Sequence, residues 1–592
     1  MVGGICTYTR SGRARLAGLL AALLLAACGG GGGDASDGGG TPHPPGTQPS
    51  GNEPKPTRDQ AFRFLTQATF GPTEPEIQSV MSLGYGPWMD QQFAKPTVSH
   101  RALWDAADAR IRAADPTPGA GQREVLDGFY RQALSGEDQL RQRTVFALSQ
   151  IFVISMQGSE VGDHERGVAG YLDMLGANAF GSYRQLLEQV ARHPMMGIYL
   201  SHLRNQKENP ATGRVPDENF AREVMQLFSI GLVQLNADGT VRKDAAGKAL
   251  ETYAGEDISG LAKVFTGWSW YGPDTSDARF WGSSKSQDAD RQWQPMQAYA
   301  QFHSVSEKRF LGQTVAAQTG TAASLKTALD TLAGHPNVAP FIARQLIQRL
   351  VTSNPSPAYV QRAAAAFGAG GDMRAMLRAV LLDDEARKPE AAADPAFGKL
   401  REPVLRLTAL LRAFGARSDS GSFLIGATDD PGTQLGQTPM RAPSVFNFYR
   451  PGFVPPNSLM AAQGLAAPEM QITHETSIVG YANYLRSGVD RGFGQSGLDG
   501  KATRRDVQPD YTQVLTLAPQ PAALVDEVSQ RLLGPQANAA FKRELQTAVE
   551  SVAVPALKAD GSNKTQVDTA LRNRVLAAVL LSAVSPEFVV QK

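Results

Sequence analysis

The clearest alternation of apolar and polar positions in the chain lies just after Pro216. Apolar residues recur there at steps of three and four, the spacing of one buried helix face. They are Phe220, Val224, Leu227 and Phe228. Asp217 precedes them, and its carboxylate can accept the free amide N–H groups of a first helical turn. Gly231 follows them and suits the left-handed conformation that often ends a helix. The pattern therefore predicts one helix over 217–231.

The opposite face of this predicted helix is polar. It carries Glu218, Asn219, Arg222, Glu223 and Gln226. Glu218 and Arg222 lie four residues apart, as do Asn219 and Glu223, so these side chains can touch. No other predicted helix begins with so dense a polar cluster. The segment is therefore the first place to look for chemistry.

Helical periodicity recurs along most of the chain, so we predict a mainly α fold. The segment 140–155 is mostly apolar after position 144, and we expect it at the centre of the fold. Two further helices, beginning after Thr73 and Ser182, are predicted to open with capping boxes through Glu76 and Gln185. The remaining predicted helices lie at 61–70, 256–265, 341–351, 358–368, 373–382, 400–415 and 566–584.

The helix predicted at 341–351 is amphipathic. Its core-facing residues are expected to be Ile342, Leu346 and Leu350, and its solvent-facing residues Arg344, Gln348 and Arg349.

Turn residues between the helices predict a small β-hairpin excursion near 233–253. A calcium loop beginning at Asn236 is excluded, because its sixth and twelfth positions hold Val241 and Gly247 in place of Gly and Glu. The segments 270–315 and 431–457 lack helical periodicity and are expected to form long irregular loops, the first with short strands. We therefore predict a single large helical domain over 59–592.

The N-terminal segment has the pattern of a bacterial lipoprotein signal. Arg10, Arg13 and Arg15 precede an apolar stretch, 16–27, that is too short to span a bilayer. The small residues before Cys28 resemble a lipobox, which implies removal of a signal peptide at 1–27 and lipidation of Cys28. An ordinary secretory signal that contains a cysteine is the alternative. Gly29 is typical of outer-membrane sorting, so we expect an exported protein anchored by lipid, with its body on the periplasmic face or the cell surface.

Residues 28–58 are rich in Gly and Pro and are predicted to form a disordered linker. Removal of 1–27 takes away Cys6, so no intramolecular disulfide can form in the mature chain. It also takes away three of the 58 basic residues, which leaves 55 against 57 acidic ones and a formal net charge of −2. This charge argues against a general nucleic-acid-binding protein, which needs a basic surface.

The polar face at 217–226 supplies the candidate catalytic residues. Glu218 and Glu223 can act as general acid and base if burial raises the pKa of one of them. The predicted catalytic set adds Arg222 and His193, and the predicted ligand-binding residues are Asn219, Trp268, His303 and Lys308. The alternative is a helix cap with an intrahelical ion-pair network. His193, which precedes Pro194, is also explained as a cap of the preceding helix.

Other chemistries have weaker support. No His and carboxylate pair has the spacing that places two metal ligands on one helical face, so we predict no metal site. GxSxG, P-loop and CxxC motifs are absent, as is a GxGxxG after a strand, and no cofactor is indicated. Aromatic side chains could form a stacking platform for a sugar, although such residues more often hold a loop to the core. They are Trp268, Trp270, Tyr271, Trp281 and Trp293.

Seven short motifs, in order along the chain, resemble those of one bacterial family. They are Ala68-Thr69-Phe70-Gly71-Pro72-Thr73, His193-Pro194-Met195, Asn219-Phe220-Ala221-Arg222-Glu223 with Leu227-Phe228 and Gly231, Phe265-Thr266-Gly267-Trp268, Phe310-Leu311-Gly312, Arg441-Ala442-Pro443-Ser444-Val445-Phe446 and Ser585-Pro586-Glu587-Phe588. Over about 59–590 the chain resembles the family called domain of unknown function 1800. The resemblance implies an exported protein whose gene often neighbours that of an exported, sulfatase-like companion. It implies no catalytic residues, because none is established for the family.

The chain departs from the usual family pattern at three polar positions. Asp217 stands where Asn is usual, Gln226 where Glu is usual, and Ser304 where Asp is usual. The loss of two carboxylates weakens any metal or acid–base site that would have used them.

Two functions remain open from the sequence. The first is an enzyme that acts on an envelope or extracellular polymer through the carboxylate, Arg and His cluster. The second is a non-enzymatic helical binding or scaffold partner of the companion sulfatase-like protein.

Overall fold

The computed structural model describes residues 55–283, 288–498, 500 and 503–592. The predicted signal peptide at 1–27, Cys28 and the predicted linker up to residue 54 lie outside these residues. The structure is 52% helical, and its described strands form sheets of only two or three strands. This confirms the mainly α fold. None of the described helices combines the length and the apolar composition needed to cross a membrane.

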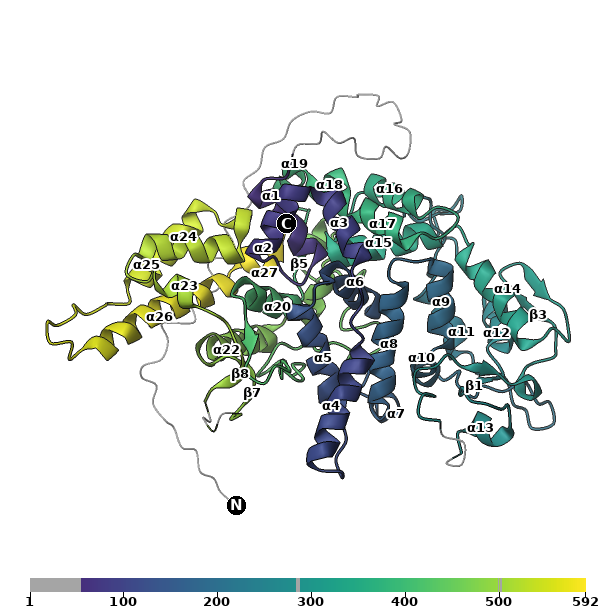
Figure 1. Ribbon diagram of the computed structural model, residues 1–592. Helices are drawn as coiled ribbons and strands as arrows, with labels where there is room; N and C mark the ends of the chain where they lie inside the picture. Colours follow the sequence, from purple (N-terminus) through teal and green to yellow (C-terminus); the bar gives the residue numbers. More distant parts are fainter. Residues whose placement is uncertain (1–54, 284–287, 499, 501–502) are drawn as a thin grey trace, which may run out of the picture. The chain divides into compact units, whose positions relative to one another are not determined.

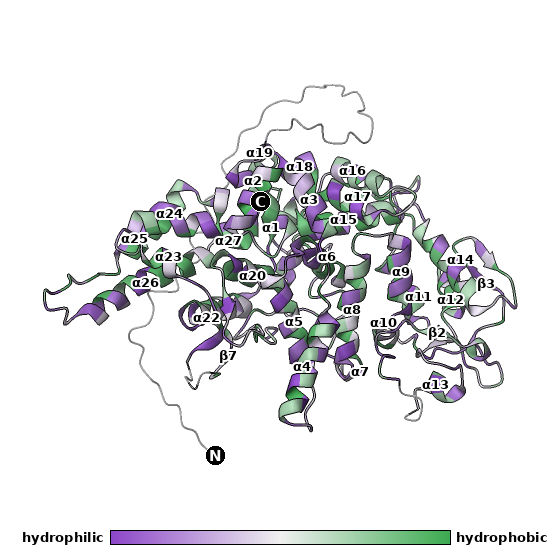
Figure 2. Cartoon of the chain, viewed as in Figure 1, coloured by the Kyte–Doolittle hydropathy of each residue, from purple (hydrophilic) through white to green (hydrophobic). Residues whose placement is uncertain are grey.

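Ten helices occupy the first part of the described chain (Figure 1). They are α1 (Arg58–Ala68), α2 (Glu74–Leu83), α3 (Tyr85–Ala94), α4 (His100–Ala114), α5 (Gln122–Ser135), α6 (Gln139–Ser149), α7 (Ser159–Gly162), α8 (Glu165–Asn178), α9 (Tyr183–Arg192) and α10 (Pro194–Tyr199). Helices α4, α5 and α8 pack against one another, and α6 packs against α1, α3, α5 and α8. Bands of hydrophobic and hydrophilic residues alternate along α4 and α8 (Figure 2), as expected for helices with one buried face.

The middle of the chain alternates short helices with short strands. The elements are α11 (Asn219–Gln226), α12 (Gly255–Val264), β1 (Trp268–Ser269), α13 (Asp277–Trp281), β2 (Gln297–Ala298), η3 (Ala300–Phe302), β3 (Lys308–Phe310), β4 (Gln313–Val315) and α14 (Thr321–Ala333). β1 pairs antiparallel with β2, and β3 with β4. Isolated antiparallel bridges join Val233 to Glu251 and Leu235 to Val241, which confirms the predicted β excursion.

The last part of the described chain is again helical. Its elements are α15 (Val338–Leu350), α16 (Pro357–Phe367), α17 (Met373–Leu382), α18 (Asp384–Arg387), α19 (Pro389–Ala393), β5 (Lys399–Leu400), α20 (Pro403–Ala413), β6 (Arg417–Ser418), α21 (Leu459–Ala462), η4 (Pro468–Ile472), α22 (Glu475–Arg491), β7 (Phe493–Ser496), β8 (Arg505–Gln508), α23 (Thr512–Leu515), α24 (Pro521–Leu532), η5 (Gly534–Gln536), α25 (Ala539–Glu550), α26 (Lys564–Ala583), α27 (Pro586–Val589) and β9 (Val590–Gln591). Helices α24, α25 and α26 pack side by side (Figure 1). The antiparallel pairing of β9 with β5 ties the end of the chain to its centre.

Two hydrophobic cores share α5 and α6. One core draws its residues from α1 to α18, and the other mainly from α20 to α27. On α6, Val145 and Leu148 belong to the first core, whereas Phe146 belongs to the second. The predicted central position of this segment is therefore confirmed, although the helix ends at Ser149 and the apolar residues after it form a buried turn.

Charged side chains are buried where these two cores meet. They are Arg143, Arg349, Lys399, Glu402 and Glu469. The Nζ of Lys399 donates to the carbonyl of Arg349 at 3.0 Å, and Glu402 accepts from Nε2 of Gln437 at 2.7 Å. The prediction that Gln348 and Arg349 face solvent is wrong, because both are 5% exposed. Their acceptors include carbonyls of distant segments, Pro451 for Gln348 and Gln150 for Arg349, and the periodicity of one helix cannot reveal such partners.

The helix predicted at 217–231 is shorter than expected. It covers Asn219–Gln226, with Glu218 at the N-cap position, and a turn replaces its last part. Asp217 still accepts the amide of Asn219, at 2.8 Å. Gly231 has the predicted left-handed backbone, with φ +70°, and its amide donates to the carbonyl of Met225 at 2.9 Å. The Asp217 carboxylate and the left-handed Gly231 therefore play their predicted roles at the two ends of the segment, whereas its final helical turn is not formed.

The two predicted capping boxes are not formed. The hydroxyl of Thr73 donates to Glu76 at 2.7 Å instead of accepting a backbone amide. Ser182 makes no side-chain cap either; its hydroxyl donates to the carbonyl of Gly370 at 3.4 Å. In both cases the hydroxyl donates a hydrogen bond to another group instead of accepting the backbone amide that the capping box requires.

Candidate functional site

The polar start of α11 lies at the surface. Glu218 and Arg222 form an ion pair 3.6 Å long, with side chains 44% and 46% exposed. Asn219 is exposed beside them. An ion pair this exposed is screened by water and contributes little stability. The structure thus brings these three predicted residues together, but on an open helix face.

Glu223 points the other way from the same helix and is buried, at 7% exposure. Its Oε2 has no hydrogen-bond partner among the described residues. Burial raises the pKa of this carboxyl, and the neighbouring Arg222 partly opposes that effect. Burial, and after it the charge of Glu223, raises the pKa values of Tyr199 and Tyr253. Glu223 is therefore a perturbed acid, separated from Glu218 by the body of the helix.

His193 is buried between α9 and α10. Its Nδ1 accepts the amide of Met195 at 3.3 Å, so the ring caps α10. Its ring packs edge-on against Tyr171, with centroids 5.0 Å apart. Burial lowers the pKa of His193 to about 3, which keeps the ring neutral. His193 is also the C-cap residue of α9, where its amide donates to the carbonyl of Val190 at 3.2 Å. The predicted cap of the preceding helix is therefore present, and the side chain caps the following helix as well.

His303 and Lys308 stabilise the turn after α12. The Nδ1 of His303 lies 2.8 Å from the carbonyl of Thr266, and its Nε2 lies 3.2 Å from the hydroxyl of Ser324. The buried Nζ of Lys308 donates to the carbonyl of Ser304 at 2.9 Å. Burial lowers the pKa values of both His303 and Lys308. These two residues thus lie near each other and are held by the turn after α12.

A cavity lies close to this region but is lined by other side chains. We call it the His164 cavity, and its volume is about 400 Å³. Its lining residues are Glu160, His164, Gly197, Ile198, Ser201, Leu203, Arg204 and Trp270. Helix α7 supplies Glu160, α10 supplies Gly197 and Ile198, and the turn after α10 supplies Ser201, Leu203 and Arg204. None of the predicted catalytic or ligand-binding residues lines it.

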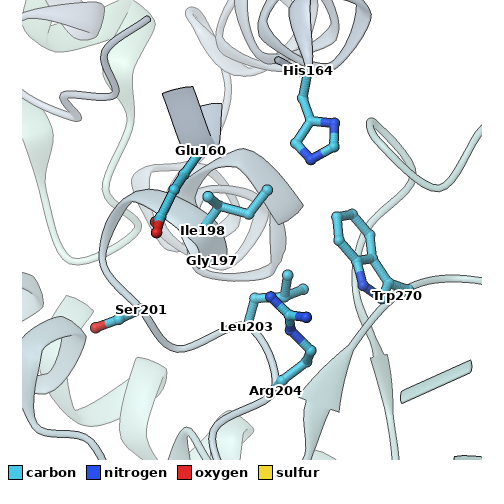
Figure 3. Close-up of a pocket in the computed structure, with 8 residues that line it drawn as sticks. All are labelled: Glu160, His164, Gly197, Ile198, Ser201, Leu203, Arg204 and Trp270. Atoms are coloured by element: carbon cyan, nitrogen blue, oxygen red, sulfur yellow. The ribbon is translucent and has the colours of Figure 1, made fainter. Parts of the chain in front are cut away.

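Three polar side chains surround the cavity in Figure 3. One ring nitrogen of His164 and the guanidinium of Arg204 point toward its open centre. Trp270 closes one side, and Glu160 lies on the opposite side. The hydroxyl of Ser201 points away. A cationic, an imidazole and a carboxylate group therefore border the same space.

The ring of His164 is neutral and fixed. Burial lowers its pKa, and the charges of Arg291 and Arg204 lower it further against the opposing effect of Asp163. Its Nδ1 lies 3.2 Å from the amide nitrogen of Gln292. That amide is a donor, so Nδ1 is the acceptor and Nε2 is left to carry the proton in this resting tautomer. The nitrogen that faces the cavity is thus Nε2.

The wall beside Arg204 has an unusual backbone. Ser201 and Arg204, two residues other than glycine, have left-handed φ values of 59° and 68°. Such conformations are strained and persist where the surroundings hold them. The amide of Arg204 donates to the carbonyl of Trp268 at 2.9 Å. Trp268 therefore supports the cavity through its backbone, while its indole is buried next to Arg192.

Trp270 is almost wholly buried, at 4% exposure. The guanidinium of Arg291 lies 4.6 Å from the centroid of its ring, and the ring of His164 lies edge-on at 6.0 Å. The indole thus forms a fixed wall of the cavity. The sequence indicates Trp270 as a possible stacking residue because it lies in an aromatic segment. No local pattern, by contrast, indicated that Glu160, His164 and Arg204 would meet around it.

Comparisons with known proteins agree with the sequence motifs. Within the described ranges, no three His, Cys, Asp or Glu side chains gather as metal ligands. No curated protein and no solved structure matches the chain. The family described as "Protein of unknown function (DUF1800)" matches residues 63–590, nearly the whole chain. The chain therefore belongs to this family.

Proposed function

We propose that the protein is an exported, lipid-anchored enzyme that acts on an anionic polymer of the cell envelope or the extracellular space. Its active centre is the His164 cavity. A volume of about 400 Å³ lies within the range typical of small-ligand sites, and a polymer would enter it one unit at a time. The lipoprotein pattern at 1–28 supports the location, because it would tether the body where such polymers lie.

Each bordering group has a role in this proposal. Arg204 binds the anionic group of the substrate, since a guanidinium matches a carboxylate or phosphate in geometry and charge. His164 acts as the general base at Nε2. The amide of Gln292 first turns so that its oxygen accepts from Nδ1–H, which frees Nε2 to take a proton from the reacting group. Glu160, on the opposite side, orients hydroxyl groups of the substrate. Trp270 keeps water from one side of the space.

The observation that carries the proposal is the placement of His164. Gln292 occupies its Nδ1, so that Nε2 faces a cavity that also contains the guanidinium of Arg204. The groups are of the same kinds that the sequence proposed for catalysis, although different residues supply them. The surface ion pair of Glu218 and Arg222 has no comparable enclosure.

Polymer turnover by the full-length lipoprotein in detergent tests the proposal. Polygalacturonate should release reducing ends, whereas the neutral glucan pullulan should not. His164→Gln should lower kcat at least 100-fold, the usual scale for loss of a proton-transferring group. His335→Gln is the matched control, because His335 is also partly buried and lies outside the cavity.

Failure to turn over any anionic polymer would contradict the proposal, as would full activity of His164→Gln. If turnover is absent and one exported protein is captured stoichiometrically from the envelope, the scaffold function would be favoured instead.

A further inference from the structure

A second cavity, of about 210 Å³, shares no lining residue with the His164 cavity. We call it the Asp127 cavity. Its polar lining residues include Arg110 on α4 and Glu124, Asp127 and Arg131 on α5. Leu103 and Ala107 contribute an apolar wall.

Asp127 is buried, at 5% exposure, yet neither of its carboxyl oxygens has a hydrogen-bond partner among the described residues. Its contact with the Nε of Arg123 spans 3.8 Å, beyond hydrogen-bond length. An ionised carboxylate in this position is unfavourable, because burial removes water and the nearby Arg123 and Gly426 amide compensate only in part. Burial raises the pKa of Asp127 to about 8; Arg123 and the Gly426 amide lower it, and Glu124 and Asp506 raise it. The group is therefore a neutral acid at neutral pH.

The side chains of Arg110 and Arg131 line the same cavity. Within the described part of the chain, neither guanidinium has an ion pair or a hydrogen bond. Glu124 differs, since its carboxylate accepts the amide of Gly121 at 2.7 Å and lies 3.2 Å from Arg123. The cavity thus contains two guanidinium groups with no described ion pair and one buried neutral acid whose oxygens have no described hydrogen bond.

We infer that the Asp127 cavity binds a small carboxylate with an apolar body. Guanidinium groups bind carboxylates through paired, charge-assisted hydrogen bonds. A protonated Asp127 can donate a further hydrogen bond to the same anionic group. The apolar wall accommodates the body of the ligand, and the charge of Glu124 disfavours a dianion such as sulfate. The inference is independent of the function proposed for the His164 cavity.

Binding at this site should depend on pH. When Asp127 ionises, it no longer donates a hydrogen bond and its negative charge repels the carboxylate of the ligand. The other charged groups that face or act on Asp127 are Arg110 on α4, Arg123, Glu124 and Arg131 on α5, and Asp506 on β8. Asparagine at position 127 keeps a donor but cannot ionise.

Calorimetric titration of the full-length protein with benzoate tests the inference. Benzoate should bind at pH 6 and at least tenfold more weakly at pH 9.5. Benzamide, its neutral counterpart of similar shape, and sulfate should each bind at least tenfold more weakly than benzoate at pH 6. Asp127→Asn should bind benzoate equally at both pH values.

The double variant Arg110→Gln/Arg131→Gln should lose at least tenfold in benzoate affinity at pH 6. Both residues are exposed, so the fold should persist. Arg112→Gln is the control on the same helix, because Arg112 pairs with Asp108 at 2.9 Å outside the cavity. The inference is overturned if millimolar benzoate does not bind at pH 6, if sulfate binds more tightly, or if the double variant binds as well as the wild type.

Discussion

The Nζ of Lys399 lies 2.9 Å from Oε1 of Glu469, and their side chains are only 1% and 2% exposed. This ion pair joins β5 to η4 where the two hydrophobic cores meet. Removing one partner leaves the other charge buried without compensation, which typically costs about 3–5 kcal/mol. Glu469→Gln should therefore lower the free energy of unfolding by about that amount, measured by urea denaturation.

The control for this prediction is the exposed pair of Lys388 and Asp384. Their separation is 2.7 Å, but their side chains are 61% and 72% exposed. Asp384→Asn should change the urea midpoint little, because water screens the pair. Equal effects of the two substitutions would contradict the account of the junction between the cores.

Gly260 on α12 is predicted to be intolerant of alanine. A Cβ at this position would lie 1.7 Å from the carbonyl oxygen of Arg309 on β3. Alanine is otherwise preferred over glycine inside a helix by about 1 kcal/mol. The clash should outweigh that preference, so Gly260→Ala should lower the free energy of unfolding by about 1–3 kcal/mol.

Gly255, at the start of the same helix, provides the comparison. A Cβ there has no neighbouring atom within 4 Å, so Gly255→Ala should leave stability unchanged or slightly higher. If both alanine variants have the melting temperature of the wild type, the close contact between α12 and β3 at Gly260 would be contradicted.

The helical class could be predicted from sequence because the 3.6-residue period is local. The start of α11 and the left-handed Gly231 followed from single residues with strong backbone preferences. Burial of Arg349 could not be predicted, since its environment includes Gln150 and Glu402 from distant segments. Its charge made solvent exposure the natural expectation.

The candidate site was harder to predict than the fold. His164, Arg204 and Trp270 come from three separate segments, and only the tertiary fold brings them together. The dense polar start of α11 predicted a helix terminus correctly, but such a terminus has the same composition whether it binds a ligand or faces water. Glu218 and Glu223 show that composition does not decide the environment. The two carboxylates lie on the same helix, yet Glu223 is buried and Glu218 is exposed.

Asp127 should make stability depend on pH. The pKa of its carboxyl is raised from 3.8 to about 8, so the folded protein keeps a proton that the unfolded chain releases. The resulting stability is fully present below about pH 4 and is lost as pH rises through 8. Asp127→Asn does not ionise, so its stability relative to the wild type should increase over this window by up to about 1.4 kcal/mol per pH unit. Urea denaturation between pH 4 and 9 measures the difference, and parallel curves would argue against a protonated Asp127.

The fall of kcat/KM at low pH should reflect protonation of His164. Burial and the charges of Arg291 and Arg204 hold its pKa below the ordinary 6.5, so kcat/KM on an anionic polymer should fall only below that pH. Arg204→Gln removes a charge that lowers this pKa, and the fall should therefore move to higher pH. A fall that stays at the same pH in the variant would show that the titrating group is not His164.

The central claim is that the His164 cavity, rather than the polar face of α11, is the active centre. The most direct test compares kcat/KM on polygalacturonate for Arg204→Gln and Arg222→Gln, with thermal denaturation to show that both variants are folded. Both substitutions remove an exposed guanidinium, and only Arg204 lines the cavity. We predict at least a tenfold loss for Arg204→Gln and less than a twofold change for Arg222→Gln. The reverse order, or equal losses, would contradict the account.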